Sequence, residues 1–374
     1  MHRVAISSTG LFTPPEIITN EELVAAYNAY AKQENEKYAD EIAAGTRVAL
    51  TDSSVEFIEK ASGIKRRYVL NKSGVLDPQR MRPKFDARPD TELSLMAEIA
   101  VKAAQDALAN AGKTGADVDG VICAAANMQR AYPAMGVEIQ TALGITGWAF
   151  DMNVACSSAT FGLEMAYNAV RTGSARAVLV VNPEITSCHL AWQDRDCHFI
   201  FGDVCTAILV ERLDLAPAGA FEVLGTRLMT SFSNAIRNNA GFMSRAEDRN
   251  PEDRDQLFRQ EGRKVFKEVC PMAAEHIAGH LAEHDLVPTQ MRRFWLHQAN
   301  LSMNQFVVRK LLGRDVNPEE APIILDEFAN TASAGSIIAF HRNKADFQTG
   351  ELGVICSFGA GYSIGSAIVQ KQAA

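Results

Sequence analysis

Short apolar runs alternate along this chain with longer segments in which apolar residues recur at helical spacing. The runs at 120–125, 177–181 and 205–210 contain almost no charged side chain, which is typical of strands buried on both faces of a sheet. Residues 93–111 instead repeat apolar and small residues three and four positions apart, which predicts a helix. The alternation indicates a layered α/β body in which helices cover a sheet.

The N-terminal quarter of the chain adds further elements to this body. Residues 4–6 predict a short strand, and Thr19 with Glu22 has the capping-box spacing that marks a helix start. The Ala- and Glu-rich residues 21–60 predict helices that lie over the body. Residues 71–89 carry Pro, Gly and Arg and predict a long solvated loop on the surface.

A second set of elements follows the Pro- and Gly-containing segment 216–219. It comprises predicted strands at 221–228, 294–296, 353–357 and 363–370 and predicted helices at 265–286, 301–312 and 336–341. Segments 119–127 and 293–300 each run from a strand into a loop that ends in Asn, which hints at an internal repeat. We therefore predict two related halves, residues 1–215 and 216–374. Insertions lie near 26–52 and 71–89, and a charged, solvated segment covers 244–263.

Composition narrows the class of protein. The chain has 374 residues, of which 47% are hydrophobic, enough for two domains or one two-lobed unit. A formal net charge of −8 argues against a general nucleic-acid binder. Seven scattered Cys without a CxxC pair indicate a reducing compartment and neither a disulfide framework nor a zinc site. The N-terminus lacks the apolar core of a signal peptide and no run could span a bilayer, so we expect a cytoplasmic protein without a membrane partner.

Cys156 lies where a strand should pass into a helix. The apolar stretch 147–150 precedes it, and small polar residues at 157–160 open a segment with helical apolar spacing that should end at Gly173. The free N–H groups and the dipole of a helix N-terminus favour a thiolate, so Cys156 is a candidate nucleophile. The alternative is a buried apolar Cys, which is the usual fate of a single thiol.

Two further strand ends carry polar side chains that suit the same chemistry. His297 follows the strand at 294–296, and Asn330 lies in the polar loop 326–334. A thiolate, an imidazole and an amide could together attack an acyl carbon and donate hydrogen bonds to its oxygen. Phe358-Gly-Ala-Gly361 could add the N–H of Ala360, which with that of Cys156 would form an oxyanion hole; an ordinary glycine-rich turn is the alternative.

In this order the motifs resemble those of the β-ketoacyl-ACP synthase III family. They are Ser8-Thr-Gly-Leu-Phe-Thr-Pro14, Gly63-Ile-Lys-Arg-Arg67, Ala155-Cys-Ser-Ser158, Phe201-Gly-Asp203, His297-Gln-Ala-Asn300, Asn330-Thr-Ala-Ser-Ala334 and Phe358-Gly-Ala-Gly361. The resemblance runs from end to end of the chain. It implies a thiolase-like fold, in which two pseudo-repeated α/β halves form a five-layered αβαβα body, and a homodimer.

The resemblance also implies a reaction: decarboxylative Claisen condensation of an acyl-CoA with a malonyl-acyl carrier protein (ACP), without a cofactor, in fatty acid biosynthesis. Cys156 would carry the acyl group, and the N–H groups of Cys156 and Ala360 would hold the oxyanion. His297 and Asn330 would bind the malonyl thioester carbonyl and stabilise the enolate left by CO₂. A second His in place of Asn330 would indicate the elongating synthases.

The chain departs from the family where CoA should bind. The usual Trp and Arg near the entrance correspond to Phe57 and Ala61, and a further Arg corresponds to Ser302. Arg195, Asn300 and Phe358 match, so Phe57, Arg195, Asn300 and Phe358 are expected substrate contacts. Tyr132 matches the aromatic that the partner subunit places at the end of the acyl pocket. The longer chain favours a medium-chain primer of about eight carbons over acetyl, since each buried methylene contributes about 0.8 kcal/mol.

An acidic ACP needs a local basic surface on this acidic chain. Arg263, Lys264, Lys267, Arg309 and Lys310 are the candidates, and solvated helix charges are the alternative. His276, His280 and His284 recur at helical spacing, but no ligating context accompanies them. We expect a solvated or cap-facing stripe and no metal. Cys188, Cys197 and Cys205 are expected to be packing residues.

Four other functions stay open at this point. They are an acetyl-CoA-primed initiating synthase, a quinolone- or polyketide-type synthase that uses CoA thioesters alone, a Cys-His-Asn hydrolase, and a thiolase-like scaffold without activity. The glycine-rich fourth segment and the internal repeat argue against the hydrolase. The presence of all three reactive side chains argues against the scaffold.

Overall fold

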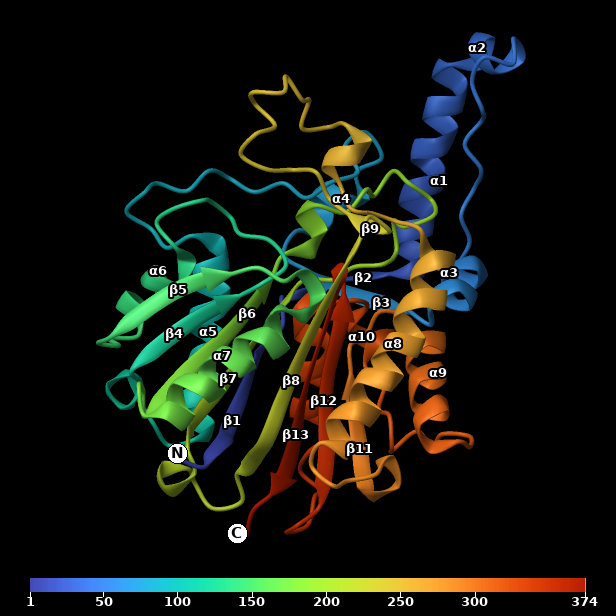
Figure 1. The fold of residues 1–374 in the computed structure, drawn as a ribbon. Coiled ribbons are helices and arrows are strands. Elements are labelled where there is room, and N and C mark those ends of the chain that lie inside the picture. The colour runs from blue at the N-terminus through green and yellow to red at the C-terminus, as the bar shows by residue number, and fades with distance from the viewer. Residues whose placement is uncertain (374) are drawn as a thin grey trace.

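A nine-stranded mixed sheet forms the centre of the computed structural model, which describes residues 1–373 (Figure 1). Its strand order is β11-β12-β13-β8-β1-β7-β6-β4-β5. Parallel pairs occur at β4–β5, β4–β6 and β11–β12, and the other neighbours are antiparallel. Among the described residues, no helix is long and apolar enough to cross a membrane.

Residues before 216 supply one side of the sheet. Its strands are β1 (Val4–Phe12), β4 (Gly120–Ala124), β5 (Trp148–Met152), β6 (Ala177–Glu184) and β7 (Val204–Arg212), and its helices are α5 (Leu95–Asn110), α6 (Met135–Ala142) and α7 (Ser158–Thr172). Every residue of β4 and β6 is buried, as their continuous apolar runs predict. The strand predicted at 4–6 is longer than expected, because Ser8 and Thr9 are also buried and pair with β7.

Residues after 216 supply the other side. Its strands are β8 (Phe221–Ser233), β11 (Met291–Leu296), β12 (Leu352–Gly359) and β13 (Gly361–Lys371), and its helices are α8 (Gly262–Ala282), α9 (Leu301–Leu312), α10 (Leu325–Phe328) and α11 (Gly335–Arg342). Within the large sheet, the two sides are joined where β1 meets β8, at the pairs Ala5–Glu222 and Ile6–Phe221. The sheet is therefore continuous there, while its two sides bend around a shared helical layer.

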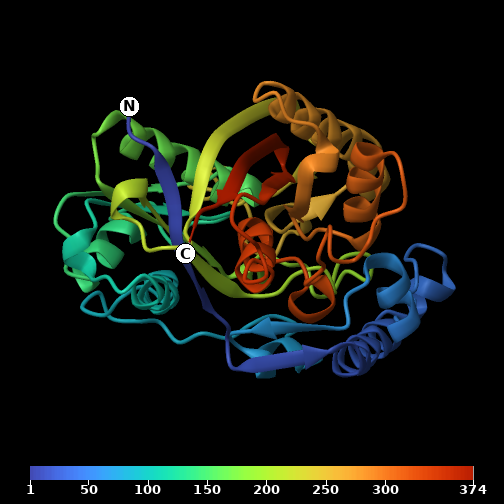
Figure 2. The same cartoon turned by 90° about the horizontal axis from the view of Figure 1, so that it is seen from below.

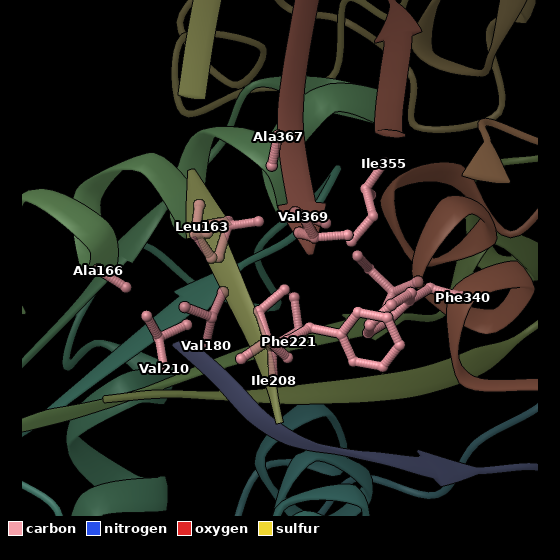
Figure 3. Close-up of a cluster of buried hydrophobic side chains, with 14 of the residues drawn as sticks. Leu163, Ala166, Val180, Ile208, Val210, Phe221, Phe340, Ile355, Ala367 and Val369 are labelled. Carbon is pink, nitrogen blue, oxygen red and sulfur yellow. The ribbon is translucent and has the colours of Figure 1, made fainter. Parts of the chain in front are cut away.

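Three hydrophobic layers separate the helices from the strands. One packs α5 and α6 on β4, β6 and β7, and another packs α8 and α9 on β11, β12 and β13. Between them, α7 and α11 pack against strands of both sides, with Leu163 and Phe340 in the same cluster as Val180 and Ile355 (Figure 3). The order helix, sheet, helix, sheet, helix confirms the predicted five-layered α/β arrangement.

The smaller elements lie outside the nine-stranded sheet. They are β2 (Glu16–Thr19), α1 (Asn20–Lys37), α2 (Ala39–Ala43), α3 (Val55–Ser62), β3 (Arg66–Val69), α4 (Lys72–Leu76), β9 (Ile236–Arg237) and β10 (Arg259–Gln260). The predicted capping box forms between Thr19 and Glu22. Figure 1 shows α1 and α2 projecting beyond the body, and Figure 2 shows the blue segments that follow β1 along one side of it.

The return of the chain along α1 depends on two Asn side chains. Asn28 and Asn35 lie two turns apart, and each exchanges two hydrogen bonds with a backbone residue of the returning segment, Ser53 and Leu50 respectively. These bonds satisfy backbone groups that have no strand partner. They bring Asp52 back to the body, where its carbonyl accepts from Arg195.

Three predictions about local structure are wrong. The 71–89 segment is not loop throughout, because Asn71 caps the short helix α4. His276 and His280 are buried rather than solvated, since they face β8 and β13 and bond to Ser366 and to the carbonyl of Arg227. Cys188 is exposed, unlike the buried Cys197 and Cys205. Among residues 1–373, no three His, Cys, Asp or Glu side chains are grouped to hold a metal ion.

Candidate active site

Cys156 lies in a tight turn between β5 and α7, at the strand-to-helix junction that the sequence predicts. The turn is the 3₁₀ segment Ala155–Ser157, and α7 begins at Ser158. Ala155 has φ +47°, a left-handed conformation that a residue with a Cβ adopts only under constraint. The Ser158 hydroxyl accepts from the N–H of Val154 at 2.8 Å, and the Ser157 hydroxyl donates to the carbonyl of Ser363 at 2.9 Å. These bonds hold the sulfur in a fixed place.

The turn between β12 and β13 lies directly against Cys156. A Cβ added to Gly359 would lie 2.6 Å from the Cβ of Cys156 and 3.2 Å from its sulfur, so only glycine fits there. The backbone N–H groups of Ala360 and of Cys156 are directed at the sulfur and act to lower its pKa. An oxyanion formed next to the sulfur would therefore meet two N–H donors from opposite sides of the sheet.

His297 follows the end of β11 and is buried, with 2% of its surface exposed. Its backbone N–H donates to the carbonyl of Cys356 on β12 at 2.8 Å. Its ring meets the ring of Phe358 edge to face, with centroids 5.3 Å apart. The backbone bond places the residue, and the contact with Phe358 restricts how its imidazole can turn.

Asn330 is held by backbone bonds on both sides of its side chain. Its N–H donates to the carbonyl of Ile200 at 2.9 Å, and its carbonyl accepts from Gly202 at 3.1 Å. Its Oδ1 accepts from the N–H of Ala332 at 2.9 Å. Because the oxygen is occupied within the loop, the Nδ2 group is the part of the amide left to donate to a ligand. The segment 326–334, predicted as a polar loop, contains most of α10 and the 3₁₀ turn Ala332–Ala334.

The electrostatics of the thiol differ from the prediction. Burial, with a smaller contribution from nearby Glu184, raises the pKa of Cys156 to about 12, because the two N–H groups oppose these effects only in part. A helix N-terminus contributes about 0.3–1 kcal/mol, which is less than the cost of burying a charge. Burial also lowers the pKa of His297 to about 4, so its imidazole is neutral at neutral pH. The resting pair is therefore a thiol and a neutral imidazole.

Two cavities meet at Cys156. The first, of about 560 Å³, is lined by Cys156, His297, Asn330, Phe358 and Gly359 at its inner end, and it reaches outward past Asn300 and Phe266. The second, of about 380 Å³, continues from Cys156 past Ala360. Its walls combine apolar side chains with polar ones, namely Phe201, Ile236, Phe258, Asn127, Asn153, His189, Arg237 and Asn238. A ligand attached to the sulfur could thus extend in two directions.

The remaining predicted contact residues are spread around the outer end of the first cavity. The Arg195 guanidinium lies 3.9 Å above the ring of Phe57, which packs on Phe199 in the cavity wall. Asn300 caps α9 through its Oδ1 and donates to the carbonyl of Ala61 at 2.7 Å. Both functions of its side chain are occupied by the protein, and Ala61 and Ser302 also line the cavity.

Tyr132 is 83% exposed on the loop before α6 and does not line either cavity of its own chain. The predicted basic residues are all exposed, and they fall into two groups. Arg309 pairs with Asp315, and Lys310 pairs with Glu275. Arg263, Lys264 and Lys267 have no carboxylate partner among residues 1–373, and Arg263 and Lys267 line the first cavity.

Two residues of the site were not singled out from the sequence. Gly359 belongs to a predicted motif, but its contact with Cys156 depends on the fold. Glu184 is a fully buried carboxyl between the Cys156 and Asn330 segments. Its signal in the sequence is an acidic residue three positions after the apolar run 177–181.

Comparisons with known proteins agree with this geometry. Residues 150–231 match the family model of 3-oxoacyl-ACP synthase III, and residues 281–371 match the model of its C-terminal part. A β-ketodecanoyl-ACP synthase of Pseudomonas aeruginosa is 57% identical over 348 residues, which are 93% of this chain and 99% of the relative. The chain belongs to the β-ketoacyl-ACP synthase III family. It is therefore a condensing enzyme of the acyltransferase class.

Other members of this family and their solved structures extend the likeness. A β-ketoacyl-ACP synthase III of Acidiphilium cryptum is 30% identical over 379 residues, covering 99% of this chain and 100% of the relative. The crystal structure of the Aquifex aeolicus synthase III covers 98% of this chain and 99% of its own, with a TM-score of 0.76 and 23% identity. That of the Pseudomonas aeruginosa synthase III covers 100% and 99%, with a TM-score of 0.76 and 20% identity. These structures confirm the predicted thiolase-like fold.

Proposed function

We propose that this enzyme condenses a medium-chain acyl-CoA of about eight carbons with malonyl-ACP. A longer primer gains binding free energy of about 0.8 kcal/mol for each methylene that it buries. The observation that carries the proposal is the meeting of Cys156, His297 and Asn330 with two N–H donors at the junction of two cavities. The β-ketodecanoyl-ACP synthase at 57% identity supports the primer length, since an eight-carbon primer and two carbons from malonyl give a ten-carbon product.

In the first half-reaction the Cys156 sulfur attacks the thioester carbonyl of acyl-CoA. A thiol with a pKa of about 12 must lose its proton as it attacks, and the neutral imidazole of His297 accepts it. The N–H groups of Cys156 and Ala360 hold the oxyanion. The C–S bond to CoA then breaks, and the proton on His297 leaves with the CoA thiolate. The products are acyl-Cys156, free CoA and a neutral imidazole.

In the second half-reaction malonyl-ACP occupies the place left by CoA. The neutral imidazole of His297 and the Nδ2 of Asn330 donate to the malonyl thioester oxygen, and CO₂ leaves to give an enolate. Its carbon attacks the acyl-Cys156 carbonyl, and the same two N–H groups hold the oxyanion. The Cys156 thiolate then leaves and takes up a proton from water, which restores the thiol. Neither donor carries a positive charge, so each stabilises the enolate by hydrogen bonding alone. The reacting groups come from the substrates and the chain, so the proposal requires no cofactor.

The two cavities can hold different parts of the substrate. We assign the pantetheine arm to the first cavity, whose outer end carries Arg263 and Lys267, and the acyl chain to the second. Phe201, Ile236 and Phe258 offer apolar surface to the chain. At the entrance, the Arg195–Phe57 stack is the surface that meets the CoA adenine, with Phe57 in the place of the family's usual Trp.

Partners and location belong to the same proposal. Arg263, Lys264 and Lys267, which have no carboxylate partner among residues 1–373, would meet the acidic ACP beside the entrance. We propose a homodimer in the cytoplasm, in which the exposed Tyr132 of each subunit reaches the end of the partner's acyl pocket.

The primer profile tests this function. Acetyl-, butyryl- and octanoyl-CoA are compared in a malonyl-ACP condensation assay, with malonyl-CoA as a second extender and Cys156→Ala as the blank. Best turnover with octanoyl-CoA is expected. Best turnover with acetyl-CoA would make the enzyme an initiating synthase, and equal use of malonyl-CoA would favour a quinolone- or polyketide-type synthase.

A further inference from the structure

A fully buried carboxyl lies between the two segments that carry the reacting groups. Glu184 is the last residue of β6 and is 1% exposed. Neither half-reaction proposed above uses it as a proton donor or as a ligand. A buried acid needs several hydrogen bonds to offset its desolvation, and each of its partners is a clue to what it holds.

On one side, Glu184 binds the segment that places Asn330. Its Oε1 accepts from the N–H of Ser333 at 3.2 Å and from the Ser333 hydroxyl. Ser333 follows Ala332, whose N–H donates to the Oδ1 of Asn330. The carboxyl therefore fixes the turn whose backbone orients the amide.

On the other side, hydrogen bonds connect Glu184 to the segment that positions Cys156. Both carboxyl oxygens accept from the N–H of Ala126, at 3.0 and 3.2 Å. The carbonyl of Ala126 accepts from the Nδ2 of Asn153 at 2.9 Å, and the Oδ1 of Asn153 accepts from the N–H of Ala155 at 2.8 Å. A continuous chain of contacts thus runs from Asn330 to the residue before Cys156.

We propose that Glu184 is a positioning residue that sets the separation between the acylated sulfur of Cys156 and the amide of Asn330 during condensation. The proposal rests on the proposed function. Burial, with a smaller contribution from Asp203, raises the pKa of Glu184 to about 8, although the bonds from Ser333 and Ala126 act to lower it. Burying a carboxyl here costs free energy, and an apolar side chain could not accept these hydrogen bonds. The carboxyl therefore fixes the positions of the two segments that it joins.

The two half-reactions separate this role from a general loss of structure. Acylation by CoA uses Cys156, His297 and Ala360. Two bonds that do not involve Glu184 also hold the Cys156 and His297 segments: the Ser157 hydroxyl donates to the carbonyl of Ser363, and the backbone N–H of His297 donates to the carbonyl of Cys356. Condensation additionally needs Asn330 at the right distance from the acyl group. A misplacement near 1 Å costs about 100-fold in rate. Loss of Glu184 should therefore slow condensation far more than acylation.

The test measures both steps in Glu184→Leu, which keeps the volume and removes the acceptors, and in Glu184→Gln, which keeps one acceptor. Acylation of Cys156 by octanoyl-CoA is followed by intact mass in single turnover, and condensation is followed after malonyl-ACP is added to the acylated enzyme. We expect acylation within about threefold of wild type, condensation about 100-fold slower in Glu184→Leu, and recovery of at least about tenfold in Glu184→Gln.

Two further variants keep the result interpretable. Ser333→Ala removes one donor and should reduce condensation in the same selective way, even if Glu184→Leu does not fold. Glu211→Leu removes another buried carboxyl, at the far end of β7 and paired with Lys113, and should lower stability without a selective loss. Equal slowing of both steps, or undiminished condensation, would overturn the proposal. A wild-type enzyme that acylates but never condenses would instead overturn the proposed function.

Discussion

Replacing Gly359 with Ala tests whether the position of the Cys156 sulfur limits the rate. The added Cβ would lie 2.6 Å from the Cβ of Cys156, 3.2 Å from its sulfur and 3.4 Å from its Cα. Carbon atoms in contact rest about 3.5–4.0 Å apart, so the two Cβ atoms must separate by about 1 Å. Gly359 does not have a left-handed φ, so the substitution adds a contact and no backbone strain.

The size of the effect follows from this displacement. A shift near 1 Å at a reacting atom costs about 100-fold in rate, or about 2.7 kcal/mol in the activation free energy. Overpacking should also lower the free energy of unfolding by about 1–3 kcal/mol. We therefore expect a folded protein whose acylation by octanoyl-CoA is about 100-fold slower than that of wild type.

The assay is single-turnover acylation of Cys156, followed by intact mass at a temperature where the variant is folded. Gly353→Ala is the matched control, because Gly353 lies on β12 like Gly359 but far from the sulfur. Its added Cβ would press on the ring of Trp295 on β11. It should lose stability and keep its acylation rate. If Gly359→Ala acylates within twofold of wild type, the contact between β12 and Cys156 does not govern the reaction, and the reasoning fails.

Three more predictions follow from the site and its surroundings. Asn330→Ala should leave acylation by CoA within a few fold and slow condensation by about 100-fold, since one donor of this kind contributes about 2.7–4 kcal/mol; equal loss in both steps would contradict its role. Lys267→Glu should raise the KM for malonyl-ACP, while Lys310→Glu, whose lysine is already paired with Glu275, should change it less; a reversed order would place docking elsewhere. Burial lowers the pKa of His276 to about 4 and of His280 to about 3, so the unfolded chain binds more protons below the usual pKa of 6.5. Their stability contribution is complete above pH 6.5 and should decrease by up to about 3 kcal/mol per histidine as the pH falls towards 4. Thermal unfolding at pH 7 and 4.5 measures it, and His280→Asn should show the smaller drop.

The sequence predicted most of the elements because their signals are local. The buried runs of β4, β6 and β7 and the helical spacing of α5 are each contained within one segment. The same local reasoning failed for His276 and His280, each of which bonds through one ring nitrogen to Ser366, a residue some 90 positions away. Helical spacing shows that such residues share a face, but not what covers that face.

The state of the Cys156 thiol shows the same limit in the site. From the sequence, the helix N-terminus was the only visible influence on the thiol, and it favours a thiolate. The folded chain adds burial and the nearby Glu184, and together these raise the pKa to about 12. Desolvation depends on every element packed around the group, so it cannot be inferred from neighbours along the chain.

The sequence by itself determined the reactive side chains, the order of the motifs and the layered α/β class, because each is written in residue types and their spacing. Only the tertiary structure decided that β12 presses Gly359 against Cys156, that Ala360 directs its N–H at the same sulfur, and that Glu184 joins two distant loops. These contacts are made by residues far apart in the chain. Their distances are set by the packing of strands and helices, which no single segment contains.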